Sequence, residues 1–215
     1  MERRILCFGD SLTWGHDPTL AGRLDTRWPR VLQECLSPDT TVIEEGQCGR
    51  NIATDDPAEG EKNGFKYILP CLESHTPLDL VIVRLGTNDC KRKYAYSAMD
   101  IAWEMRRFLE KVLTHRHFQC ADGYQVLLMA PPPITGAIQT SWLGDVFGYD
   151  EGRRKSQQLA GHFRGLAARY GCLFLDAGEF AAASDLDGIH LDAENQRKLG
   201  EAVARFVKEL EGKKC

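Results

Sequence analysis

The hydrophobic residues of this chain follow two alternating patterns. One pattern consists of short apolar runs that are rich in β-branched and aromatic residues. Such runs are typical of strands that are covered on both faces. We predict strands at five of them: residues 5–8, 41–43 with an extension to Glu45, 80–85, 126–129 and the weaker run 173–175.

The second pattern has the spacing of a helix. Apolar residues recur at every third or fourth position, which places them on one face of a helix that packs against a core. Stripes of this kind run through residues 101–112, 159–170 and 199–210, and shorter helices are predicted at 28–36 and 64–73. Ser97 and Asp100 precede the first stripe with the spacing of a capping box, and Asp192 is the predicted N-cap of the last helix.

The alternation of strands and helices indicates βαβ units, and hence a parallel sheet with helices on both faces. We therefore predict an α/β fold with a mostly parallel, five-stranded sheet. The length of 215 residues and the lack of a low-complexity linker favour one domain over residues 1–215.

Two segments fit neither pattern. Residues 50–63 are polar, and residues 131–152 are rich in proline and glycine but carry Trp142, Phe147 and Tyr149. Long loops in compact domains are often functional. We interpret the second segment as an apolar wall or lid over a site.

The composition of the chain limits the kinds of partner that we expect for this protein. The net charge is −4 and the charged residues are spread along the chain, so we expect no nucleic-acid partner. No apolar run approaches the ~20 residues of a membrane span. The run behind the first four residues is too short for a signal peptide, so we expect a cytoplasmic protein. The sequence leaves the oligomeric state open, a homo-oligomer included.

The chain has eight cysteines but no Cys-x-x-Cys pair. Without export, the cysteines are expected to be reduced thiols. Their spacing indicates no zinc site, and we expect neither a metal nor another cofactor.

The candidate chemistry lies where the predicted strands end, because ligands of open α/β sheets bind beyond the carboxyl ends of the strands. Ser11 follows the first strand, Asn88 follows the third, and His190 lies just before the last helix. Acyl transfer through a serine needs a histidine base, an acid that orients the histidine, and donors for the oxyanion. Asp187 and Asp185 both precede His190, and the spacing favours Asp187 as the orienting acid.

Several of these residues lie in motifs that resemble those of a known family. The string FGDSLTWG at residues 8–15 resembles the GDSL motif of the SGNH hydrolases, and three further blocks follow in the family's order: Gly49, GTND at 86–89, and Asp187-x-x-His190. The strings VIEEG at 42–46, LDLVIVRLGTND at 78–89 and DGIH at 187–190 are similar to the bacterial arylesterase and acyltransferase branch. That branch acts on short-chain acyl esters, and some members pass the acyl group to alcohols.

The resemblance implies a flavodoxin-like, three-layer α/β/α sandwich and a role for each block. Ser11 is then the nucleophile, His190 the base and Asp187 its orienting acid. The oxyanion hole consists of the Ser11 N–H, the Gly49 N–H and the Asn88 side chain. The assignment of Gly49 rests on the position of the corresponding loop in the family. Cys48 or Arg50 would supply this N–H if the loop were bulged differently.

We therefore predict a serine esterase for small-molecule esters. Trp14, Trp142 and Phe147 are candidates for the substrate pocket, with core or interface packing as the alternative for each. A carbohydrate O-deacetylase, a lysophospholipase or a thioesterase would use the same triad. A non-catalytic, flavodoxin-like binding module is the alternative of another class, although the chain has neither a G-x-G-x-x-G motif nor a P-loop.

Overall fold

A computed structural model describes residues 3–19, 22–118 and 123–212. Its centre is a parallel sheet in the order β2-β1-β3-β4-β5. The strands are β1 (Arg3–Gly9), β2 (Thr40–Gly46), β3 (Leu80–Arg84), β4 (Gln125–Ala130) and β5 (Leu173–Asp176). All five predicted strands are confirmed, and this strand order is that of the flavodoxin-like fold.

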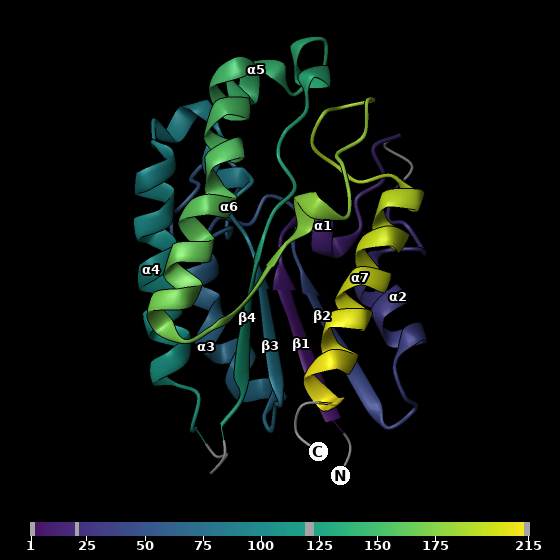
Figure 1. Cartoon of the computed structure of the whole chain (residues 1–215). Coiled ribbons are helices and arrows are strands. Elements are labelled where there is room, and N and C mark those ends of the chain that lie inside the picture. Colours follow the sequence, from purple (N-terminus) through teal and green to yellow (C-terminus); the bar gives the residue numbers. More distant parts are fainter. Residues whose placement is uncertain (1–2, 20–21, 119–122, 213–215) are drawn as a thin grey trace.

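Helices cover both faces of the sheet (Figure 1). On one side, α2 (Trp28–Cys35) packs against α7 (Ala193–Gly212). On the other side lie α3 (Gly64–His75), α4 (Ala98–Thr114) and α6 (Asp150–Tyr170). The predicted three-layer α/β/α sandwich is therefore confirmed.

The core lies between these layers. Residues 5–8 of β1 and 80–83 of β3 are fully buried, as the continuous apolar runs of two-sided strands predict. Strand β2 lies at the edge of the sheet, and most of it is only half-buried. Edge position explains why its sequence ends in acidic residues rather than in a longer apolar run.

The predicted caps are present. The Ser97 hydroxyl accepts from the Asp100 N–H at 3.2 Å, and the Asp100 carboxylate accepts from the Ser97 N–H at 2.8 Å, which closes the capping box of α4. Asp192 accepts from the Asn195 N–H at 2.8 Å and caps α7. Each cap satisfies a helix N–H that has no partner within the helix.

Helix α6 begins earlier than the apolar stripe predicted. Its first residue is Asp150, whereas the stripe begins at Leu159, because the first turns of the helix are polar, although Gly152, Lys155 and Ser156 are buried. Residues 131–152 are consequently not one irregular loop. They contain the short elements η3 (Gly136–Gln139) and α5 (Gly144–Phe147), which lie near the carboxyl ends of the strands (Figure 1).

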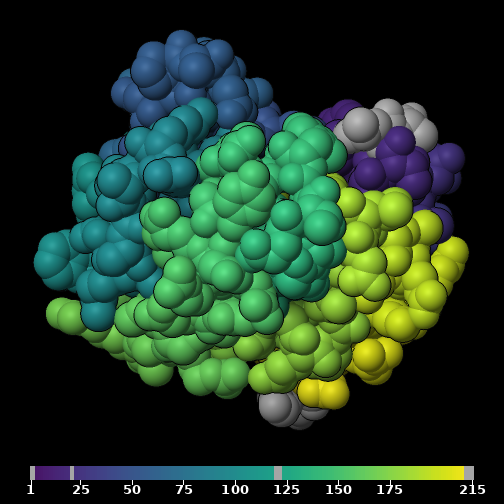
Figure 2. All heavy atoms as spheres, turned by 90° about the horizontal axis from the view of Figure 1, so that it is seen from above, coloured from purple at the N-terminus to yellow at the C-terminus, as the bar shows by residue number. Residues whose placement is uncertain are grey.

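Figure 2 looks down on this end of the molecule, where residues near 50–63 form a lobe at one side. No helix in the described part of the chain is long and apolar enough to cross a membrane. Six cysteines are free thiols, as expected: Cys7, Cys35, Cys48, Cys71, Cys90 and Cys172. Cys120 and Cys215 lie outside the described residues.

Candidate active site

Ser11 lies where strand β1 turns into the short helix α1 (Ser11–Trp14). The Asp10 side chain caps this helix by accepting from the Leu12 N–H at 2.9 Å, and Gly15 ends it in the left-handed conformation with φ +88°. Ser11 is therefore the first helical residue. Its N–H has no carbonyl partner within the helix.

Helix α1 lies directly on the end of strand β2. A Cβ atom at Gly46 would lie 2.2 Å from the backbone nitrogen of Trp14, so a larger residue would push the helix away. Because the helix carries Ser11, this close approach also fixes the height of the serine above the sheet.

A buried ion pair supports the same turn. The Arg84 guanidinium at the end of β3 binds the Asp10 carboxylate and donates to the Thr13 hydroxyl at 3.2 Å. Both charged side chains are completely buried, and burial lowers the pKa of Arg84 to about 9. Such a pair is costly to break, since either partner alone would be an uncompensated buried charge.

Ser11, His190 and Asp187 form a hydrogen-bonded chain. The His190 Nε2 atom lies 3.0 Å from the Ser11 hydroxyl, and its Nδ1 atom lies 2.6 Å from the Asp187 Oδ2 atom. The other Asp187 oxygen accepts from the N–H groups of Ile189 and His190 at 2.9 Å each. Burial opposes the charge of Asp187, but these bonds and the nearby His190 lower its pKa overall. Asp185, the alternative acid, is exposed.

The three predicted oxyanion donors line the same cavity. Asn88 begins the 3-10 helix η1 (Asn88–Cys90), and its amide donates to the Arg50 carbonyl at 3.2 Å. An asparagine amide has two N–H donors, so one remains for a ligand. Gly49 has φ +80°, and a Cβ atom there would lie 2.7 Å from the Glu59 carboxylate.

The cavity above Ser11 has a volume of about 280 Å³. Its polar side includes the serine, His190 and Asn88. Its apolar side consists of residues from α5, the two residues before it, and Ile189. The complete described lining is Ser11, His16, Cys48, Gly49, Glu59, Thr87, Asn88, Lys91, Trp142, Leu143, Val146, Phe147, Ile189 and His190.

Comparison with known proteins agrees with this geometry. Residues 7–198 match the GDSL-like lipase/acylhydrolase family. The chain belongs to this family. A comparison with curated proteins gave no significant match.

Two solved structures are similar to this GDSL-like lipase/acylhydrolase over nearly its whole length. The aryl esterase of M. smegmatis is 39% identical, has a TM-score of 0.90, and the match covers 97% of this chain and 99% of that one. A carbohydrate acetylesterase family member from Sinorhizobium meliloti is 36% identical with a TM-score of 0.90, and the match covers 98% and 99%. The resemblance inferred from the sequence motifs is confirmed, and the chain is a carboxylic ester hydrolase.

The predicted substrate residues of this GDSL-like lipase/acylhydrolase lie in different places. Phe147 is buried in the cavity wall, whereas Trp142 lines the cavity with 62% of its surface exposed. The ring of Trp14 is not part of the described lining and lies under the Arg23 guanidinium at 5.4 Å.

The structure also brings in side chains that the sequence analysis did not assign to the site. The His16 ring lies 4.3 Å from the His190 ring, and burial, followed by electrostatic repulsion between the two imidazoles, lowers the pKa of His16. Lys91 and Glu59 form an ion pair of 2.7 Å in the lining. Glu59 reaches the site through the fold of residues 50–63, for which the sequence has no periodic signal.

Proposed function

We propose that the protein is a serine esterase that hydrolyses short-chain alkyl and aryl esters through an acyl-enzyme at Ser11. The observation that carries the proposal is the hydrogen-bonded chain from the Ser11 hydroxyl through His190 to Asp187. A serine hydroxyl is a weak nucleophile at neutral pH, and a histidine at hydrogen-bond distance is the base that it needs.

The reaction follows from these contacts. His190 Nε2 takes the Ser11 proton as the hydroxyl oxygen attacks the ester carbonyl. Asp187 keeps the proton of His190 on Nδ1 and stabilises the imidazolium. His190 then gives the proton to the departing alcohol, and the same atom activates the water that releases the acid. An alcohol in place of this water would receive the acyl group instead.

The oxyanion is stabilised by preorganised donors. We assign this role to the N–H groups of Ser11 and Gly49 and to the Asn88 amide, which line one cavity. The hydrogen bonds from such donors become stronger as negative charge develops on the carbonyl oxygen. Removal of one donor typically lowers kcat by about 10²–10³-fold.

The size and walls of the cavity support small acyl esters. Its volume of about 280 Å³ lies just below the ~300–1,000 Å³ that is usual for pockets of drug-sized ligands. Phe147 and Leu143 close one side with apolar surface. An ordered apolar wall favours a short acyl chain or an aryl group over a polymer, and the similar aryl esterase of M. smegmatis supports this choice.

A carbohydrate O-acetyl ester is the second candidate substrate. The similar structure from Sinorhizobium meliloti is described as a carbohydrate acetylesterase family member. In this chain, the Glu59 and Lys91 side chains in the cavity lining can hydrogen-bond sugar hydroxyls. The triad would remain the same, and only the alcohol part of the ester would differ.

The test is hydrolysis of p-nitrophenyl acetate, butyrate and octanoate, with acetylated glucose alongside, by the wild type and Ser11→Ala. We expect the acetate or butyrate to be cleaved fastest, and kcat to fall by about 10³–10⁶-fold in the variant. An unchanged rate in Ser11→Ala would refute the nucleophile. A preference for octanoate would refute the short acyl chain, and a preference for acetylated glucose would favour the second candidate.

Location and assembly are further proposals. We propose that the protein is cytoplasmic and that residues 1–215 form a single domain. A homo-oligomer is compatible with the exposed Trp142 and Val146 at the rim of the cavity, and sedimentation would measure the oligomeric state.

A further inference from the structure

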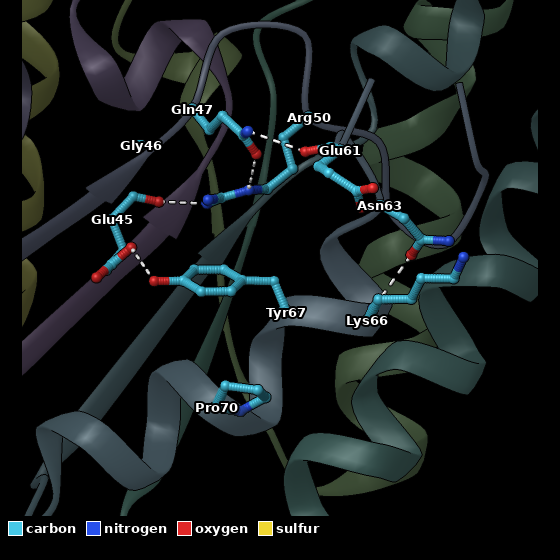
Figure 3. A pocket seen from close by; sticks show the side chains of 9 residues that line it. All are labelled: Glu45, Gly46, Gln47, Arg50, Glu61, Asn63, Lys66, Tyr67 and Pro70. Atoms are coloured by element: carbon cyan, nitrogen blue, oxygen red, sulfur yellow. Dashed lines mark hydrogen bonds between the residues drawn. The ribbon is translucent and has the colours of Figure 1, made fainter. Parts of the chain in front are cut away.

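A second hollow of about 570 Å³ lies beside the edge strand β2 and helix α3. Figure 3 shows its lining, in which Glu45 and Arg50 face Tyr67. None of its lining residues in the described chain belongs to the lining of the catalytic cavity. The esterase mechanism therefore leaves this region without a role.

Glu45, which lines this hollow, also lies against two further side chains of metal-ligating types, Cys71 and His75. Glu45 comes from β2, and Cys71 and His75 come from α3. Cys71 and His75 are four residues apart, so they share one face of the helix. One ligand atom of each residue lies within 4.8 Å of the other two. Cys71 is buried, whereas the Glu45 and His75 side chains are 20% and 28% exposed and can be reached from solvent.

We propose that Glu45, Cys71 and His75 bind a divalent transition-metal ion of the zinc type. Thiolate, imidazole and carboxylate are the three protein ligands that zinc uses. Three such ligands leave the fourth tetrahedral position for water, as in open zinc sites.

Two of the three ligand residues already lie slightly closer together than a tetrahedral site requires. His75 Nε2 lies 2.8 Å from Glu45 Oε1, and the Tyr67 hydroxyl donates to Glu45 Oε2 at 3.3 Å. Tetrahedral bonds of about 2.0–2.3 Å separate neighbouring ligand atoms by about 3.3–3.7 Å. The Glu45–His75 contact must therefore widen by less than about 1 Å, which a side-chain rotation of the half-buried His75 can supply.

Metal binding must also remove a proton. Burial and the adjacent Glu45 carboxylate raise the pKa of Cys71 to about 12, so the thiol is protonated at neutral pH without a metal. On binding, the thiol proton leaves to solvent and the metal–sulfur bond forms. The thiolate and the Glu45 carboxylate then balance the two positive charges of the ion.

The positive charge of Arg50 lies near the proposed site and weakens the binding of a cation. Its guanidinium lies over the Phe8 ring at 4.2 Å, donates to the Gly9 carbonyl at 2.9 Å, and also donates to the Glu45 carbonyl. Its charge favours the Cys71 thiolate but repels a divalent cation. We therefore expect weaker binding than at structural zinc sites with four protein ligands.

The experiment must separate this site from the catalytic cavity, whose lining includes Cys48, His16 and His190 as further residues of metal-ligating types. Full-length protein without a histidine tag is treated with a chelator and titrated with Co²⁺. A thiolate–cobalt charge-transfer band in the near ultraviolet reports a Co–S bond. The variants are Cys71→Ser and His75→Gln, and Cys48→Ser is the matched control.

We expect the wild type and Cys48→Ser to bind one Co²⁺ with the thiolate band. Cys71→Ser should lose the band, and His75→Gln should bind at least about tenfold more weakly. Loss of the band in Cys48→Ser with retention in Cys71→Ser would overturn the proposal, and so would a wild type without the band. Thermal unfolding of each metal-free variant checks its fold, and His75→Gln keeps the test valid if Cys71→Ser does not fold.

Zn²⁺ provides a second readout. At free zinc about 100 times the wild-type Kd, we expect the wild-type Tm to rise by about 5–10 °C, and the Tm of His75→Gln to rise by at most about half as much. An equal rise in both proteins would overturn the site. Neither readout depends on esterase activity, so failure here and failure of the proposed function are distinguishable.

Discussion

Asp187 holds His190 in one orientation because both of its carboxylate oxygens are occupied. One oxygen accepts from two backbone N–H groups and the other accepts from His190 Nδ1. Asp187→Asn would place an amide against that ring and favour the wrong tautomer. We expect kcat on p-nitrophenyl acetate to fall by about 10⁴-fold with little change in KM. The exposed Asp185→Asn is the control, and an equal loss there would contradict the assignment.

The buried carboxyl of Asp89 should make the free energy of unfolding depend on pH. Its carboxyl is completely buried, which raises its pKa to about 7, while the Ile52 N–H at 3.0 Å partly offsets this effect. The native chain therefore keeps a proton that the unfolded chain releases near pH 4. Because the native state binds more protons between about pH 4 and pH 7, this group lowers stability as the pH rises through that window.

Asp89→Asn should remove this contribution, since an asparagine oxygen can still accept from Ile52. We expect the variant to gain free energy of unfolding relative to the wild type as the pH rises from about 5 to about 8. Urea unfolding at several pH values measures the difference. Parallel curves for the two proteins would show that Asp89 does not titrate in this window.

The Arg84–Asp10 pair predicts a large loss of stability at a position that touches no substrate. Arg84→Met would leave the Asp10 carboxylate buried without its partner, at a cost of about 3–5 kcal/mol. Lys198→Met breaks an exposed pair with Glu194 in α7 and should change stability little. Chemical unfolding of both variants checks the contrast, and similar losses would contradict it.

At the scale of elements, helix α1 depends on glycine at the end of β2. A Cβ atom at Gly46 meets the backbone of Trp14, so Gly46→Ala should cost about 1–3 kcal/mol and lower kcat by displacing Ser11. Gly165 in α6 has open space around its Cβ position. Gly165→Ala should instead gain up to about 1 kcal/mol through helix propensity. Equal effects of the two changes on stability and kcat would refute the role of the close approach.

The elements that the sequence predicted are those with a dense apolar signal. The stripe from Ile101 to Val112 and the cap at Ser97 located α4 because burial and capping both act locally. The first turns of α6 were missed because they are polar, and α1 is too short for any periodic pattern. Such elements are held by tertiary contacts, like that between Arg84 and Asp10.

At the scale of the whole molecule, the parallel sheet brings together residues that are 179 positions apart. Ser11 and His190 meet because both follow strands whose carboxyl ends lie at one edge. Positions that follow the predicted strands were therefore enough to identify Ser11, Asp187 and His190 as candidates. The family resemblance then supplied the role that we propose for each. The sequence could not place His16 against His190, or Lys91 against Glu59, because these contacts depend on loop paths that carry no pattern.

The proposed metal site could not be predicted from the sequence either. Cysteine spacing alone indicated no zinc site, since two of the three ligands are not cysteines and one comes from another element. The sequence places Cys71 and His75 four residues apart, but the predicted helix ended at residue 73, whereas the helix in the structure continues to His75. Only the fold adds Glu45, which lies on the neighbouring edge strand.

We propose that Ser11 is the residue that becomes acylated during turnover. The most direct measurement is labelling with an aryl phosphonate, followed by intact mass and peptide mapping of the wild type and Ser11→Ala. We predict one adduct per wild-type chain, on Ser11, with esterase activity lost in proportion to labelling, and no adduct on the variant. An adduct on another residue, or equal labelling of Ser11→Ala, would contradict the account.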